Sequence, residues 1–203
     1  SYRSRAWKIR GVDTPLRNLH MAGNDNLYAY RYDWDDHRRF VVADFKKLIG
    51  ASHGTEISLI TGNNKLVEGY GFLIYPAGPS KRFTSKNMML FWSNFAKEGK
   101  PGTSTNGINW ELYNHSKGNK NFMILDNRKN MNLVKLDTTY KKLVEELNID
   151  TRVNELERCV ILYQMGTFVG NDILDTISKY ATFSCKRSDS KKFLEENDSF
   201  ISY

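Results

Sequence analysis

The sequence predicts an α/β fold, the class in which strands and helices share one core. Three observations support this prediction. Residues 27–33 read LYAYRYD and alternate aromatic with small or polar side chains, which is typical of a β-strand. Two short apolar runs on either side of a turn predict a hairpin over residues 121–136. Apolar residues recur at helical spacing in residues 84–98 and again in residues 138–180.

The predicted helix over residues 84–98 has recognisable start and stop signals. Thr84 or Ser85 can act as its N-cap, and a Gly-Lys-Pro run from Gly99 onward stops it. Its apolar side chains recur on one face, so we expect a core position for three of its aromatic residues, Phe91, Trp92 and Phe95.

The two ends of the chain differ in pattern. The first 25 residues are basic and then rich in turn-forming residues, with a short helix possible from Pro15, since proline is favoured in the first turn. From residue 138 the periodicity predicts three helices, at about residues 138–148, 154–165 and 172–180. Residues 186–203 form a charged tail that we expect to fray. All of this is expected to form one segment of a single domain.

The composition is that of an ordinary globular protein. The 203 residues include 40% hydrophobic and 26% charged side chains, and this length can supply one good-sized core or a large piece of something bigger. No apolar run approaches the roughly 18 residues that a membrane span requires. The chain opens on Ser1 without an apolar signal segment. Localisation therefore stays open, with a cytoplasmic location slightly favoured over secretion.

The positive charge does not by itself indicate a nucleic-acid partner. The net charge is +7, but the basic residues occur as scattered doublets interleaved with acids, without a stripe or a known nucleic-acid motif. We therefore interpret the charge as a solvated basic surface.

The two cysteines leave two interpretations open. Cys159 and Cys185 are too few for a disulfide scaffold and lack the spacing of metal ligands. They form either one bridge or two buried thiols.

Residues 50–57, which read GASHGTEI, carry the chemistry that the sequence offers. They lie between two apolar runs, residues 40–43 and 57–60, and contain a match to G-x-S-x-G centred on Ser52. A nucleophile elbow needs a buried strand that leads into a sharp turn and then a helix. Because residues 46–49 and the β-branched residues after the turn do not fit that order, the pattern disfavours Ser52 as a nucleophile.

His53 is the better candidate in this stretch. Two glycines flank a loop that can present its imidazole to a cleft, and an imidazole titrates near neutral pH, so it can take a proton from a hydroxyl and return it to a leaving group. Glu56 could orient the loop as a supporting carboxylate. The motif alone is equally compatible with a structural histidine and a surface glutamate.

Four landmarks in order make the chain similar to a known family. They are the tyrosine-rich strand, the GASHGTE loop, the run FWSNFAKEGKP from Phe91 and the segment WELY from Trp110. Together they resemble the C-terminal third of the type-B carboxylesterases and lipases, the family of the cholinesterases, although that family usually has proline where Glu111 stands. The resemblance is weak after Leu136.

The resemblance implies the C-terminal part of an α/β-hydrolase fold, with a mixed, mostly parallel sheet. It implies that His53 is the histidine of a catalytic triad and that Ser52 and Glu56 are its supporting neighbours. In such enzymes the serine, the acid and the oxyanion hole lie upstream, so we expect them on an N-terminal part or a companion chain. The implied substrate is a small-molecule ester, and the chemistry needs neither a metal nor an organic cofactor.

Two further expectations follow. Trp34, at the end of the predicted strand, is expected in the core or on the surface rather than in a substrate pocket. The competing functional hypothesis is a noncatalytic binding or scaffold protein that keeps the esterase architecture without the chemistry.

Overall fold

The computed structural model describes residues 1–63, 71–114, 120–185 and 192. The chain divides into two compact units, where the sequence predicted one segment of one domain. The first unit combines residues 1–22 with the chain from residue 137 onward, and the second comprises residues 23–136. We call them the helical unit and the sheet unit. The predicted tail over residues 186–203 lies outside the described residues except for Lys192.

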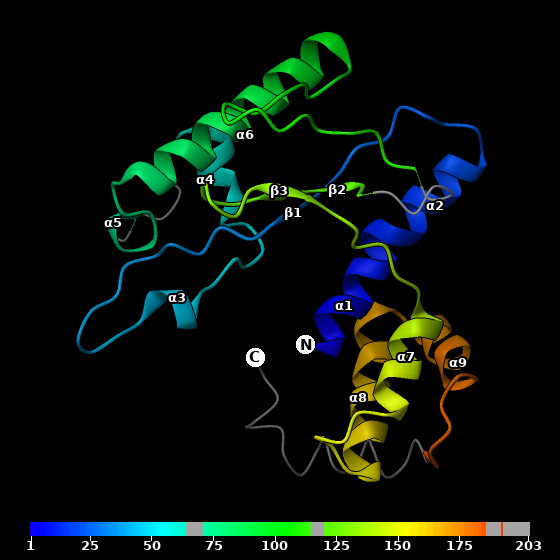
Figure 1. Ribbon diagram of the computed structural model, residues 1–203. Coiled ribbons are helices and arrows are strands. Elements are labelled where there is room, and N and C mark those ends of the chain that lie inside the picture. Colours follow the sequence, from blue (N-terminus) through cyan, green and yellow to red (C-terminus); the bar gives the residue numbers. More distant parts are fainter. Residues whose placement is uncertain (64–70, 115–119, 186–191, 193–203) are drawn as a thin grey trace. The chain divides into compact units, whose positions relative to one another are not determined.

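The sheet unit is built on a three-stranded mixed sheet in the order β1-β2-β3 (Figure 1). β1 pairs with β2 in parallel, with Ala29 opposite Phe122, and β2 pairs with β3 antiparallel, with Met123 opposite Leu133. The predicted strand and hairpin are therefore confirmed, and parallel pairing does not predominate in the described sheet. The strands are β1 (Ala29–Tyr32), β2 (Phe122–Leu125) and β3 (Asn132–Val134).

The described part of the connection between β1 and β2 contains four helices. The longest, α6, packs against α4. All four side chains of β2 are buried, which explains why this strand reads as a continuous apolar run. The helices are α3 (Phe45–Leu48), α4 (Glu56–Thr61), α5 (Gly71–Ile74) and α6 (Pro79–Glu98).

Helix α6 starts five residues before the predicted Thr84. Pro79 occupies its first turn, where a missing N–H costs no hydrogen bond. Thr84 is fully buried inside the helix, and its hydroxyl lies 3.0 Å from the backbone oxygen of Asp126. The predicted stop is confirmed, since Gly99 adopts φ +69° and donates its N–H to the carbonyl of Phe95.

Aromatic side chains fill the core of the sheet unit. Trp34 and Phe91 are fully buried. This confirms the core position predicted for Phe91, and it places Trp34 in the core, one of the two positions expected for it. Trp92 is partly buried and packs against this core. The core position predicted for Phe95 was wrong, because this residue, in the last turn of α6, is 47% exposed. Its ring contacts the ring of Tyr28 edge to face.

The helical unit places the first residues of the chain against its last helices. The sequence missed the helix α1 and predicted only the short helix that is α2. Leu143, Leu162 and Ile177 are among the buried aliphatic residues that form its core. Its helices are α1 (Tyr2–Lys8), a π-helical turn (Ile9–Asp13), α2 (Thr14–Met21), α7 (Tyr140–Asn148), α8 (Glu155–Val169) and α9 (Asn171–Ser178).

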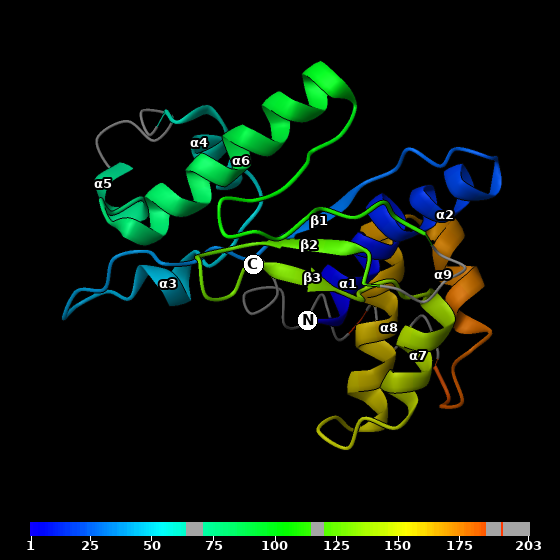
Figure 2. The ribbon, with the colours of Figure 1, turned by 45° about the horizontal axis from the view of Figure 1, so that its top comes forward.

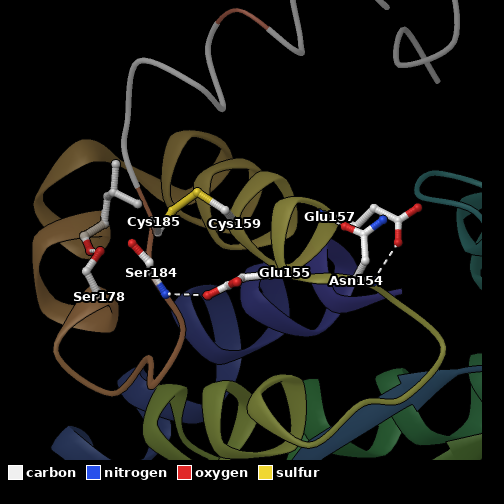
Figure 3. Close-up of a disulfide and its surroundings, with 8 residues drawn as sticks. Asn154, Glu155, Glu157, Cys159, Ser178, Ser184 and Cys185 are labelled. Atoms are coloured by element: carbon white, nitrogen blue, oxygen red, sulfur yellow. Dashed lines mark hydrogen bonds between the residues drawn. A yellow bond between two sulfur atoms is a disulfide. The ribbon is translucent and has the colours of Figure 1, made fainter.

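Helix α8 is fixed at its beginning and by a covalent bond. The side chain of Asn154 accepts the backbone N–H of Glu157, and the carboxylate of Glu157 accepts the backbone N–H of Asn154, which completes a capping box (Figure 3). Cys159 in α8 is bonded to Cys185. The disulfide resolves the alternative that the sequence left open, and it ties the segment after α9 back to α8.

Candidate active site

Residues 50–55 form a tight turn that leads from α3 into α4, and Glu56 and Ile57 are the first residues of α4. Gly50 and Gly54 adopt φ +56° and +89°, the left-handed region that glycine enters without strain. The hydroxyl and the backbone N–H of Thr55 both donate to the carbonyl of Ser52, at 2.7 and 3.2 Å. Thr55 and Ser52 therefore close the turn around His53. The side chain of His53 is exposed to solvent.

Two contacts fix the ends of this turn to the rest of the sheet unit. At the first end, the Nε2 of His37 lies 2.8 Å from the carbonyl oxygen of Gly50. At the other end, the hydroxyl of Tyr75 donates to the carbonyl of Thr55 at 2.8 Å. His37 and Tyr75 are 6% and 3% exposed. An exposed imidazole is thus carried on a turn that two buried side chains hold in place.

His37 is the residue of the candidate site that sequence reasoning missed. Its Nδ1 lies 2.5 Å from the carbonyl oxygen of Ile74, at the end of α5, so one ring bridges α5 and the turn. A neutral imidazole carries one N–H, and only the doubly protonated ring can donate to both carbonyls. Its ring also contacts Trp34 edge to face. The available signal was its place in a polar run directly after a strand, a common position for residues that organise a site.

The segment that carries His37, residues 33–37, connects several elements of the sheet unit. The indole N–H of Trp34 donates to the hydroxyl of Ser80 at 2.9 Å, and that hydroxyl donates to Asp36. Asn127, in the turn between β2 and β3, donates to the same carboxylate at 3.2 Å. The position of the turn around His53 is therefore linked to β1, α6 and the hairpin.

Glu56 begins α4 and is partly buried. Its negative charge adds to the effect of burial, which is the larger cause, in raising the pKa values of Tyr30, Tyr32 and Tyr75. Glu56 therefore stands among tyrosine rings at the base of the turn.

Ser52 does not lie in a nucleophile elbow. The residues before it form the short helix α3, whereas an elbow requires a strand in that place. The sequence prediction was wrong in one detail, because the residues that follow the turn are helical and form α4. Ser52 instead supplies the carbonyl that closes the turn and leaves its side chain exposed.

Apart from the turn, the sheet unit has a hollow between β1 and α6. Its volume is about 190 Å³ and its lining is almost wholly aromatic. Such a lining can contact an apolar group, but it offers no nucleophile and no base. The residues around it are Tyr28, Tyr30, Phe91, Trp92, Phe95, Pro101 and Trp110.

Within the described ranges, no three His, Cys, Asp or Glu residues gather in an arrangement that could hold a metal ion. No helix in the same part of the chain is both long and apolar enough to cross a bilayer.

The architecture and the turn define a mixed helix and strand protein with a histidine on a fixed, solvent-facing turn. Comparison with known protein families matches residues 12–145 to the carboxylesterase family. The match covers more than half of the 203 residues and includes the whole turn. The chain therefore belongs to the carboxylesterase family, which confirms the resemblance seen in the sequence. Comparisons with curated proteins and with solved structures found no match.

Proposed function

We propose that this chain supplies the catalytic histidine, His53, of a serine carboxylesterase with an α/β-hydrolase fold. The observation that carries the proposal is a solvent-facing imidazole on a turn fixed at Gly50 and at Thr55. Membership of the carboxylesterase family supports ester hydrolysis as the reaction. A base must keep one geometry relative to its substrate, and a turn with both ends fixed meets that requirement.

In the proposed mechanism, a serine hydroxyl attacks the ester carbonyl while His53 takes the hydroxyl proton. His53 then returns this proton to the departing alcohol, which leaves an acyl-enzyme. Water attacks the acyl-enzyme by the same route and releases the carboxylic acid. The tetrahedral intermediates need an oxyanion hole, and the imidazolium needs an acid partner.

We assign the nucleophile, the acid and the oxyanion hole to a preceding part of the same enzyme or to a companion chain. The only G-x-S-x-G match in the 203 residues is the one at Ser52, and the helix before it does not form an elbow. In this proposal Ser52 closes the turn and Glu56 supports its base.

Steady-state hydrolysis of a chromogenic ester by the whole enzyme tests this assignment. We expect His53→Ala to lower kcat on the order of 10⁴-fold or more, because the base acts mainly in the transition state. Ser52→Ala should keep most of the activity. His20→Ala is the matched control, since it removes a histidine from the helical unit, and it should leave kcat unchanged. A His53→Ala enzyme with nearly full kcat would contradict the proposal.

The alternative is an esterase-like scaffold without catalysis. It predicts no ester turnover in the wild type at any pH, together with an unaltered fold in His53→Ala.

A further inference from the structure

Residues 38–45 form a small hairpin that projects away from the sheet of its unit, next to α3 (Figures 1 and 2). We call it the valine hairpin. Phe40 and Ala43 exchange backbone hydrogen bonds of 2.8 and 3.3 Å, and Arg39 forms an antiparallel bridge with Asp44. The backbone N–H of Phe45 donates to the carbonyl of Arg38 at 3.1 Å. These bonds leave the next two residues, both valines, as the two residues of the turn.

The residues at the tip are contrary to ordinary turn chemistry. Two-residue turns favour Gly, Asn, Asp, Pro and Ser, whose backbones or side chains suit the bend, whereas β-branched residues suit strands. Val41 and Val42 nonetheless occupy the tip, with relative exposures of 106% and 94%. Phe40 is 42% exposed and Leu48, on the adjacent α3, is 71% exposed. The hairpin thus holds an apolar tip in full contact with solvent.

Positive charge surrounds the base of this tip. Residues 38–48 contain four cations and one carboxylate, and with Asp35, the partner of Lys46, the net charge of this group is +2. Arg39 pairs with that carboxylate, Asp44, at 3.4 Å, and Lys46 pairs at 2.7 Å with Asp35, which precedes the hairpin. The guanidinium of Arg38 stands over the ring of Phe72 at 5.9 Å. Lys47 is exposed. These four cations, which we call the basic collar, therefore keep a positive excess.

We propose that the valine hairpin docks this protein on an anionic lipid surface. The two valines enter the boundary between headgroups and acyl chains, and the basic collar meets the negative headgroups. A protein partner fits less well, since a stable protein interface buries about 800 Å² on each side, far more than a two-residue tip supplies. The proposal does not depend on ester hydrolysis, because it rests on the hairpin alone.

Vesicle co-sedimentation of the whole protein tests this docking. We expect binding to phosphatidylcholine vesicles that contain phosphatidylserine, and much weaker binding to phosphatidylcholine alone or at high salt, where surface charges are screened. The double substitution Val41→Ser with Val42→Ser should weaken binding about tenfold or more, since it removes the apolar contacts. Lys47→Ser should weaken binding to the anionic vesicles by about fivefold.

Ile149→Ser is the matched control. Ile149 is 79% exposed at the end of α7, in the helical unit, so its substitution removes a highly exposed aliphatic side chain that does not belong to the hairpin. This variant should bind vesicles as the wild type does. Equal binding by the double valine variant, or no binding to either vesicle, would overturn the proposal. So would self-association of the wild type, measured by sedimentation velocity and lost in the double variant, because the tip would then be a contact between copies.

Discussion

The two units of this protein are held together by different means. The sheet unit has an aromatic core in which polar groups of buried rings bond to other elements, as the indole of Trp34 does to Ser80. The helical unit has an aliphatic core and is closed by the Cys159–Cys185 disulfide and by ion pairs such as the largely buried pair of Arg17 with Asp137. The sheet unit lies wholly within the matched family region, whereas that region ends inside α7. Hydrogen bonds of fully buried rings thus accompany the unit that carries the candidate site, whereas the rings of Tyr2 and Tyr140, which bond to other elements of the helical unit, are only partly buried.

The largest expected effect on stability comes from the aromatic core. Trp34→Ala removes a fully buried ring and its bond to Ser80, so we expect a loss of about 3–5 kcal/mol in the free energy of unfolding. Leu143→Ala, in the aliphatic core of the helical unit, should cost about 2–5 kcal/mol. Hydrogen exchange measured peptide by peptide should show the lost protection of Trp34→Ala in residues 23–136. An equal loss of protection in both units would show that the two units are not stabilised by separate cores.

The disulfide should matter to the helical unit alone. The bridge joins residues 26 apart, and a loop of this length contributes about 3–4 kcal/mol by restricting the unfolded chain. Cys159→Ser with Cys185→Ser should lower the stability of the helical unit by about that amount and leave the exchange of the sheet unit unchanged. Structural disulfides persist in oxidising compartments, so finding the bridge in the native protein would argue against the cytoplasmic location favoured by the sequence.

His37 offers a test of directional bonding in the sheet unit. His37→Ala leaves the carbonyls of Ile74 and Gly50 without their buried partner, which we expect to cost about 2–4 kcal/mol. His37→Gln supplies an amide donor and should recover part of this loss. Exchange of the amides in residues 50–57 should increase in the alanine variant. If glutamine and alanine have equal effects, packing rather than hydrogen bonding fixes the turn.

Close helix packing can be tested at Gly166. A Cβ at this position of α8 would lie 2.5 Å from the Cβ and 2.9 Å from the Cα of Leu174 in α9. Because the backbone of α9 would have to move, Gly166→Ala should cost about 1–3 kcal/mol. Gly11→Ala is a suitable control, since a Cβ there meets nothing within 4 Å. Thermal unfolding of the two variants compares them directly.

The smallest effect is a dependence of stability on pH in the helical unit. Burial raises the pKa of Asp13 above its ordinary value of 3.8, in spite of the ion pair with Lys8 at 2.5 Å. The folded unit therefore keeps a proton that the unfolded chain has already lost, so stability falls as pH rises from about 3.8 to the raised pKa. The slope cannot exceed about 1.4 kcal/mol per pH unit for one proton. Denaturation of Asp13→Asn across this range should lack that slope.

The sequence predicted local features well where one signal decided the structure. The alternation in residues 27–33 gave β1, and Gly99 ended α6 as expected. The start of α6 was predicted wrongly because Thr84 has the side chain of a cap, yet it is buried by a contact with the backbone after β2. Because the two residues of that contact are 42 positions apart, a local sequence pattern cannot predict it.

The candidate site was predicted in part for the same reason. The glycines and His53 are adjacent in sequence, so the turn could be identified from residues 50–57. The supports of the turn, His37 and Tyr75, come from separate segments and depend on how the chain folds. The exposed valines were also missed, because an apolar run such as residues 40–43 ordinarily indicates a buried segment. The packing of the first helix against α8 likewise depends on residues far apart in the chain.

Labelling of the whole enzyme with a fluorophosphonate probe, followed by mass spectrometry of its peptides, tests the role of His53 as the catalytic base. We expect one labelled serine outside these 203 residues, and loss of that label in His53→Ala but not in His20→Ala. A label on Ser52, or an undiminished label in His53→Ala, would show that His53 does not have this role.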